Sequence, residues 1–154
     1  MTLRDDLDLS FTVHLKSSRA QLWAAWTTPE HIPHWFIPKP HKITACDLNL
    51  TVGGRFNTTF EVEGNIIENT GVFLELIPET RLVTTDGYSE GWVPSENPFL
   101  TAIVEFEDHP EGGTLYSATA RHRTKDAAQS HKEMGFFEGW GIVAQQLDAY
   151  ALTL

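Results

Sequence analysis

The sequence predicts an α+β fold in which a curved antiparallel β-sheet of about six to seven strands grips a long C-terminal α-helix. Three observations predict it. One strand-like segment opens the chain and is followed by two short helical segments. Strand-length segments joined by short turns then fill most of residues 43–122, and apolar residues at helical spacing follow from residue 126. Short turns join strands in antiparallel order, and helices on one face of such a sheet define the α+β class.

Apolar and polar residues alternate over residues 9–15, a period of two that is typical of a strand with one buried face. Ser17 or Ser18 is a suitable N-cap for a short helix over residues 19–26. Thr28-Pro29-Glu30 indicates the start of a second short helix that reaches about Trp35. Pro33 interrupts this second helix, so we expect it to be broken or partly 3₁₀.

The central strands are separated by Pro, Gly, Asn and Asp at turn positions. We expect them over residues 43–50, 56–62, 66–77, 81–85, 99–107 and 114–122. Gly71 lies inside the longest of these segments and indicates a bulge or the close approach of another backbone. Residues 86–98 hold two Pro and two Gly around Tyr88 and Trp92, a composition that predicts a loop.

From Asp126 onward the apolar residues form one helical stripe that consists of Phe136, Trp140, Val143, Leu147, Tyr150, Ala151 and Leu154. A single helix over residues 126–152 is therefore predicted. Gly135, Gly139 and Gly141 each destabilise a helix interior by about 1 kcal/mol relative to Ala, and indicate a kink or the close approach of the sheet or a ligand. The stripe is expected to pack on the concave face of the sheet, and a strongly bent sheet around one helix tends to leave a space.

Composition and charge limit the function classes. The 154 residues, 41% of them hydrophobic and 21% charged, suit one globular domain over residues 1–154. Net charge is −10, from 21 acidic and 11 basic residues, and the densest basic run is confined to residues 121–125. Phosphate-binding surfaces need clustered Lys and Arg, so we expect neither nucleic acid nor an anionic membrane as a partner.

The single cysteine, Cys46, excludes an intramolecular disulfide and a multi-cysteine zinc site, and we interpret it as a small buried hydrophobe. The N-terminal residues carry acids where a signal peptide has basic charge. No apolar stretch approaches the length of about 18 residues that a membrane helix needs. We therefore expect a cytoplasmic protein.

Several sequence motifs resemble those of the START-like (SRPBCC), helix-grip superfamily, and within it the branch of proteins similar to the activator of Hsp90 ATPase homologue 1. The motifs cover most of the chain. They are residues 18–26 with Thr28-Pro29-Glu30-His31, the pair Trp35-Phe36, Gly53-Gly54-Arg55-Phe56, residues 71–78 with Arg81-Leu82-Val83, residues 106–114, and Gly139-Trp140 ahead of Leu147. The sequence departs from the family pattern at Ala144 and in the loop of residues 88–99.

The resemblance implies a cavity between the curved sheet and the C-terminal helix that holds an apolar or amphipathic small molecule. We expect no cofactor. From the strand and helix faces that are predicted to point inward, together with the Trp of the long loop, we take the candidate ligand-binding residues to be Phe56, Phe60, Phe73, Trp92, Ile103, Tyr116, Phe136, Trp140 and Val143. The alternative is that these residues form an ordinary filled core.

Catalytic candidates are weak, and no catalytic residue is assigned. Glu105 shares a strand face with Ile103, and His122 shares one with Tyr116, so an inward-facing Ile103 and Tyr116 would bring a carboxylate and an imidazole to the cavity. Asp86 and Tyr88 are further polar candidates. The alternative places Glu105 in solvent and His122 at the rim of the sheet. No nucleophile elbow, catalytic triad spacing or phosphate-binding loop is present.

Three histidines are candidates for a metal site. His31, His34 and His41 lie close in sequence, but Pro33 interrupts the spacing and no Cys or carboxylate follows at ligand distance. We therefore predict no metal.

Three functions are compatible with these features of the sequence. The first is a small-molecule binding domain, the second a hydrolase, cyclase or dehydratase that uses Glu105 and His122, and the third a chaperone-associated interaction module, for which the family name is the sole motive. A homodimer is also expected, because the aromatic residues Trp23, Trp26, Trp35 and Trp92 fall on short helices or loops.

Overall fold

A computed structural model describes residues 2–154. Its larger layer is a five-stranded sheet in which every neighbouring pair is antiparallel. The strands lie in the order β1 (Asp8–Leu15), β10 (Thr114–Arg121), β9 (Thr101–Asp108), β6 (Arg81–Thr85) and β5 (Val72–Ile77). The first and next-to-last strands of this sheet along the chain, β1 and β9, therefore flank β10.

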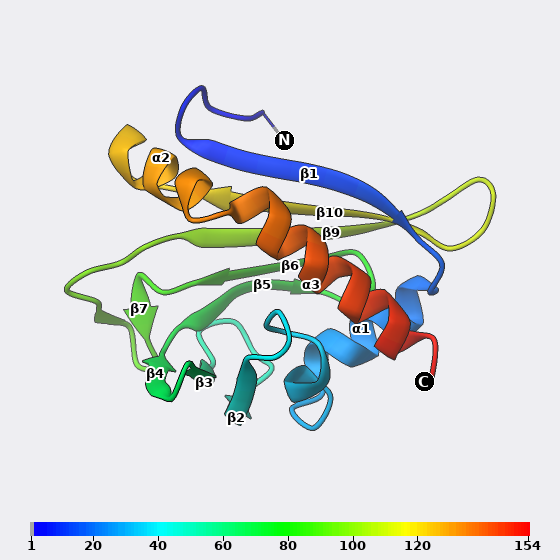
Figure 1. Cartoon of the computed structure of the whole chain (residues 1–154), viewed down its shortest axis with the longest axis horizontal. Helices are drawn as coiled ribbons and strands as arrows, with labels where there is room; N and C mark the ends of the chain where they lie inside the picture. The colour runs from blue at the N-terminus through cyan, green and yellow to red at the C-terminus, as the bar shows by residue number, and fades with distance from the viewer. Residues whose placement is uncertain (1) are drawn as a thin grey trace.

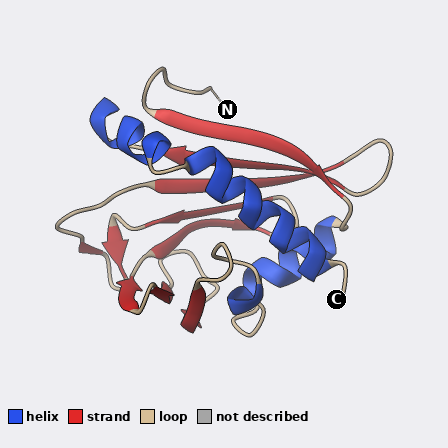
Figure 2. Cartoon of the chain, viewed as in Figure 1, coloured by secondary structure: helices blue, strands red, loops and turns tan. Residues whose placement is uncertain are grey.

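A three-stranded antiparallel sheet continues the structure beyond β5. It consists of β2 (Lys42–Leu48), β3 (Phe56–Val62) and β4 (Asn65–Asn69). A single bridge between Arg55 and Val72 joins the two sheets. The bent junction turns the smaller sheet out of the plane of the larger one, so that together they form a curved surface (Figure 2).

The helices lie on one side of the larger sheet. α1 (Arg19–Thr27) is capped by Ser18 and Gln21 in a capping box, and the 3₁₀ turn η1 (Ile32–His34) follows it. Near the C-terminus come α2 (Lys125–Glu133) and α3 (Phe136–Ala151), and α3 crosses the sheet diagonally (Figure 1). The predicted class, an antiparallel α+β fold that grips a C-terminal helix, is confirmed.

The C-terminal helix is divided, which corrects the prediction of one helix over residues 126–152. Gly135 has a φ of 95°, and this left-handed residue separates α2 from α3. Such a left-handed backbone conformation is readily available only to glycine. The predicted kink is thus a complete break between α2 and α3.

The predicted strand over residues 66–77 is also divided. β4 pairs with β3 in the small sheet, whereas β5 pairs with β6 in the large one, and Gly71 lies between them. A Cβ atom on Gly71 would lie 2.6 Å from the carbonyl oxygen of Thr85. The expected close approach of another backbone is therefore present, and it marks the point where the chain passes between sheets.

Two further segments differ from the prediction. The second helix is reduced to the single turn η1, because Pro33 has no N–H to continue a hydrogen-bond ladder. The predicted loop over residues 86–98 contains a two-residue hairpin, β7 (Tyr88–Ser89) with β8 (Val93–Pro94). In residues 2–154 no helix combines the length and the apolar character needed to cross a lipid bilayer.

The core lies between α3, α1 and the face of the five-stranded sheet that α3 covers, which we call the inner face. In β9 this face carries Ala102, Val104 and Phe106, and in α3 the fully buried residues Leu147 and Ala151 face it. The core at the α1 end is filled. The space between the other end of α3 and the small sheet is not.

Candidate functional site

A pocket of about 450 Å³ lies between the N-terminal half of α3, the inner face and the small sheet. This volume is within the range of small-molecule sites. Its wall is mainly apolar. The residues that line it are Trp26, Phe36, Ile37, Pro38, Phe56, Thr58, Phe60, Asn69, Thr70, Gly71, Thr84, Thr85, Asp86, Phe99, Leu100, Ala102, Val104, Tyr116, Ala118, His131, Met134, Gly135, Phe136, Gly139, Trp140 and Val143.

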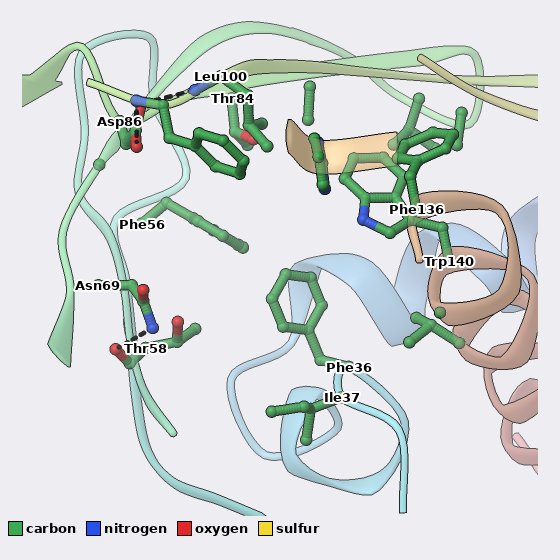
Figure 3. Close-up of a pocket in the computed structure, with 18 of the residues that line it drawn as sticks. Phe36, Ile37, Phe56, Thr58, Asn69, Thr84, Asp86, Leu100, Phe136 and Trp140 are labelled. Carbon is green, nitrogen blue, oxygen red and sulfur yellow. Dashed lines mark hydrogen bonds between the residues drawn. The ribbon is translucent and has the colours of Figure 1, made fainter. Parts of the chain in front are cut away.

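Aromatic rings face one another across this pocket. Phe136 and Trp140 of α3 lie on one side, and Phe36 and Phe56 lie across from them (Figure 3). Each pair packs within itself, with ring centroids 4.6 Å apart for Phe136 and Trp140 and 5.6 Å apart for Phe36 and Phe56. The rings therefore build two walls and leave the middle of the pocket open.

Polar side chains gather at the end of the pocket near β4 and the end of β6. Thr58 and Asn69 lie together there, and Asp86 lies above them (Figure 3). The carboxylate of Asp86 accepts hydrogen bonds from the backbone N–H groups of Phe99 at 2.9 Å and Leu100 at 3.1 Å. Asp86 thus joins the end of β6 to the approach to β9 and closes the hairpin segment between them.

Tyr116 supplies a buried hydroxyl on the sheet side of the pocket. The indole N–H of Trp26 donates to its Oη atom at 3.2 Å. Burial raises the pKa of Tyr116, although the Trp26 hydrogen bond opposes this, so the hydroxyl stays protonated at neutral pH.

Two buried histidines meet at the opposite end of β10. His122 Nδ1 lies 2.9 Å from the Leu7 carbonyl oxygen, and His122 Nε2 lies 2.9 Å from His131 Nδ1. His122 is 2% exposed and His131 is 7% exposed. Only His131 is part of the pocket wall, where its ring packs against Phe99 at 4.7 Å between centroids.

Six of the nine predicted ligand-binding residues line the pocket, and three do not. Those in the lining are Phe56, Phe60, Tyr116, Phe136, Trp140 and Val143. Phe73, Trp92 and Ile103 lie elsewhere, each for a different reason.

Ile103 lies on the face of β9 that points away from the pocket, so its prediction as a lining residue is wrong. Ala102 and Val104 line the pocket, so Ile103 points to the opposite face by the alternation of a strand. It is 5% exposed, although it lies outside the core under α3, because Val83 and Thr119 are its partners on the two neighbouring strands.

Phe73 and Trp92 are separated from the pocket by other groups. Phe73 is fully buried behind Phe56, with ring centroids 5.3 Å apart. Trp92 lies on the turn between β7 and β8, is 53% exposed, and packs edge-on against Tyr88 and beside Gly53. Neither ring contributes to the pocket wall.

The pairing required by the enzyme hypothesis is not formed. Glu105 shares the outer face with Ile103 and makes an ion pair with Arg81 at 3.0 Å, with its side chain 38% exposed. His122 is bonded to Leu7 and His131. The interpretation that places Glu105 in solvent describes its position better, whereas His122 is buried and not at an open rim.

The remaining nucleophilic and metal-binding candidates are occupied or unreactive. Burial, with the nearby charges of Asp47 and Glu30, raises the pKa of Cys46 to about 11, so the thiol is protonated at neutral pH. His31 Nδ1 lies 2.6 Å from the Tyr150 hydroxyl, and His34 stacks on the same ring. Among residues 2–154 no group of three or more His, Cys, Asp or Glu side chains is arranged to hold a metal ion.

The tryptophans that favoured self-association are mostly internal. Trp26 is 6% and Trp35 1% exposed, and Trp23 packs edge-on against Phe106. Trp92 is exposed, beside the exposed Tyr88. The homodimer stays a prediction.

Sequence reasoning missed the contributions of α1, of the Trp35-Phe36 segment and of α2. Trp26 and Phe36 belong to the motifs that carry the family resemblance but not to the predicted ligand-binding residues, and their large aromatic side chains are the signal that could have indicated them. His131 gave no signal, because one imidazole in a polar helix is ordinary on the surface.

The family of this chain is shown by its similarity to known proteins. The family model described as Activator of Hsp90 ATPase homolog 1-like protein matches residues 16–151. The chain belongs to this family. A comparison with curated proteins finds no match.

Solved structures of similar proteins agree with this membership. A Nitrosomonas europaea protein is 36% identical, with a TM-score of 0.94 over 98% of this chain and 97% of that chain. A Mycobacterium smegmatis protein is 24% identical, with a TM-score of 0.78 over 94% and 90%. The AHSA1-like protein of Aeromonas hydrophila is 21% identical, with a TM-score of 0.72 over 96% and 93%. The last two likenesses concern the fold alone.

Proposed function

We propose that this member of the Activator of Hsp90 ATPase homolog 1-like family binds an apolar or amphipathic small molecule in the pocket beneath α3. The observation that carries the proposal is the unfilled volume of about 450 Å³ between the Phe136–Trp140 wall and the Phe36–Phe56 wall. Small-molecule sites are typically concave, mainly apolar clefts of a few hundred Å³ with a few polar groups, and this pocket has that size and lining.

Gly139 gives the proposal additional support. It lies in the interior of α3 and lines the pocket, and an added Cβ atom would meet no atom within 4 Å. Glycine destabilises a helix interior by about 1 kcal/mol relative to alanine. A glycine in this place keeps the pocket wide at the expense of helix stability.

The experiment compares two substitutions in the same helix. Gly139→Leu projects a side chain into the pocket, whereas Gly141→Leu makes the same change where an added Cβ atom also meets nothing and which is not part of the pocket lining. Binding of the neutral fluorescent probe N-phenyl-1-naphthylamine is titrated with each variant and with the unmodified protein. Chemical denaturation of each variant checks that it folds.

We expect the probe to bind the unmodified protein and Gly141→Leu with similar affinity, and Gly139→Leu at least 10-fold more weakly. Both substitutions should keep or raise the stability of α3, since each replaces a helix-interior glycine. Equal binding by all three proteins, or no binding by the unmodified protein, would contradict the proposal.

A further inference from the structure

One nitrogen of the buried histidine pair makes no hydrogen bond within the described residues. His131 lines the pocket and is 7% exposed. Its Nδ1 atom is bonded to His122, and within residues 2–154 no side chain or backbone group is hydrogen-bonded to Nε2. The two nitrogens lie on opposite edges of the imidazole ring, so Nε2 points away from His122.

The hydrogen-bond chain decides which nitrogens carry protons. A carbonyl oxygen can only accept, so His122 Nδ1 donates to Leu7. With both rings uncharged, His122 Nε2 is then an acceptor, and it receives the Nδ1–H of His131. This leaves a lone pair on His131 Nε2, which makes that atom a hydrogen-bond acceptor.

The surroundings of His131 keep its ring uncharged. Phe99, Phe136 and Trp140 surround it with centroid distances of 4.7, 5.1 and 5.8 Å. Burial, and secondly repulsion from His122, lower the pKa of His131 to about 4. At neutral pH the His131 ring is therefore uncharged, as the acceptor form requires.

The charges of the pocket also limit its occupant. Among residues 2–154 no Lys or Arg lines the pocket, and the one carboxylate in its lining, Asp86, accepts hydrogen bonds from backbone N–H groups. A ligand carboxylate or phosphate would be buried without a cation, which is strongly unfavourable. An uncharged ligand avoids this penalty.

We propose that His131 Nε2 accepts a hydrogen bond from the hydroxyl group of an uncharged, largely apolar ligand, and that the pocket selects such alcohols or phenols over apolar acids. This rests on the proposed function, because it names the ligand class of the same pocket. A ligand without a donor would leave Nε2 desolvated and unpaired, so the hydroxyl gives selectivity against the corresponding hydrocarbon as well.

The test uses three probes that share one apolar body: butylbenzene, 4-butylphenol and 4-butylbenzoate, titrated calorimetrically at pH 7.5. With the unmodified protein we expect 4-butylphenol to bind about 3- to 10-fold more tightly than butylbenzene, the range expected of one neutral hydrogen bond. We expect 4-butylbenzoate to bind most weakly.

Variants assign the preference to His131. His131→Phe should remove the advantage of 4-butylphenol over butylbenzene, and His131→Gln, whose amide oxygen can accept, should keep part of it. His14→Phe, the same change at an exposed position on the outer side of β1, should behave like the unmodified protein. Since His131→Phe leaves His122 without its partner, NMR of the unmodified protein gives a second measurement: the ¹⁵N signal of His131 Nε2 should shift with 4-butylphenol and not with butylbenzene.

The outcomes separate the two proposals. If butylbenzene binds, and binding is lost in Gly139→Leu, but 4-butylphenol binds no more tightly and leaves the Nε2 signal unmoved, the hydroxyl proposal is wrong and the pocket proposal stands. If none of the three probes binds, the pocket proposal fails, and the hydroxyl proposal fails with it.

Discussion

Ser17 Oγ donates a hydrogen bond of 2.6 Å to Oδ1 of Asp148, which joins the start of α1 to the last turns of α3. The same carboxylate accepts the backbone N–H groups of Ser17 at 2.9 Å and of Lys16 at 3.0 Å. An acidic residue near a helix C-terminus is unfavourable with respect to the helix dipole. Its presence indicates that this clamp, which fixes one end of α3 to the sheet, outweighs the local penalty.

Replacing Asp148 should therefore destabilise the protein. Asp148→Ala removes the acceptor of the buried Ser17 N–H and of the Lys16 N–H, and leaves Ser17 Oγ with only the Asp148 carbonyl oxygen at 3.1 Å. We expect the free energy of unfolding to fall by about 2–4 kcal/mol. Urea denaturation measures it. Asp108→Ala is the control, because Asp108 is 76% exposed in its side chain and its ion pair with Arg19 lies on the surface, where such pairs contribute less than about 1 kcal/mol. Similar losses in both variants would contradict the role given to Asp148.

The break between α2 and α3 depends on Gly135. With a φ of 95°, an alanine there would be held in a left-handed conformation, and its Cβ atom would lie 3.3 Å from Glu138 Oε2. We expect Gly135→Ala to lower the free energy of unfolding by about 1–2 kcal/mol. Gly141→Ala, within regular helix, should instead raise it by up to about 1 kcal/mol. A stabilising effect of both substitutions would mean that the helices can merge into one.

Acid should destabilise the protein through His131. Its pKa is about 4 when folded and about 6.5 when unfolded, so between these values the unfolded state binds more protons. Stability is therefore fully present above pH 6.5 and falls as the pH drops toward 4, by an amount on the order of 2 kcal/mol.

The measurement for this prediction is urea unfolding at intervals from pH 7.5 to 5. His131→Gln should show a flatter dependence than the unmodified protein, and His14→Gln, which removes an exposed imidazole, should keep the original slope. An unchanged slope in His131→Gln would show that the ring is not protected from protonation by the fold.

Tyr116 and Trp26 give a prediction on the other side of the pocket. Tyr116→Phe keeps the ring but removes the acceptor of the Trp26 indole N–H, which lies buried at 3.2 Å. We expect a loss of about 1 kcal/mol in the free energy of unfolding. Differential scanning calorimetry measures this loss. Phe60→Leu is the control, because Phe60 is a half-buried lining residue whose side chain makes no hydrogen bond, and a similar loss there would mean that the Trp26 bond is not the cause.

The sequence predicted the fold well because its signals are local. Alternation in β1, the cap at Ser18 and the stripe through Phe136 and Leu147 each depend on neighbours along the chain. The face of β9 was predictable too: Ala102, Val104 and Phe106 form a wholly apolar set, whereas Ile103 shares its face with two glutamates. The prediction that Ile103 lines the pocket relied on the size of that one side chain and was wrong.

The parts that could not be predicted depend on contacts between distant segments. The break at Gly135 is a backbone choice that three helix glycines allow equally, and only packing selects one of them. The bond between His122 and His131 joins the residue that follows β10 to the interior of α2. Sequence spacing carries no information about such a meeting.

The most direct test of the central claim, that the space beneath α3 is a binding site, is a crystal structure of the protein grown with 4-butylphenol. We expect electron density for the ring between Trp140 and Phe56, with the hydroxyl oxygen within hydrogen-bond distance of His131 Nε2. A structure at saturating probe in which side chains have closed this space, or in which the probe lies only on the surface, would contradict the account.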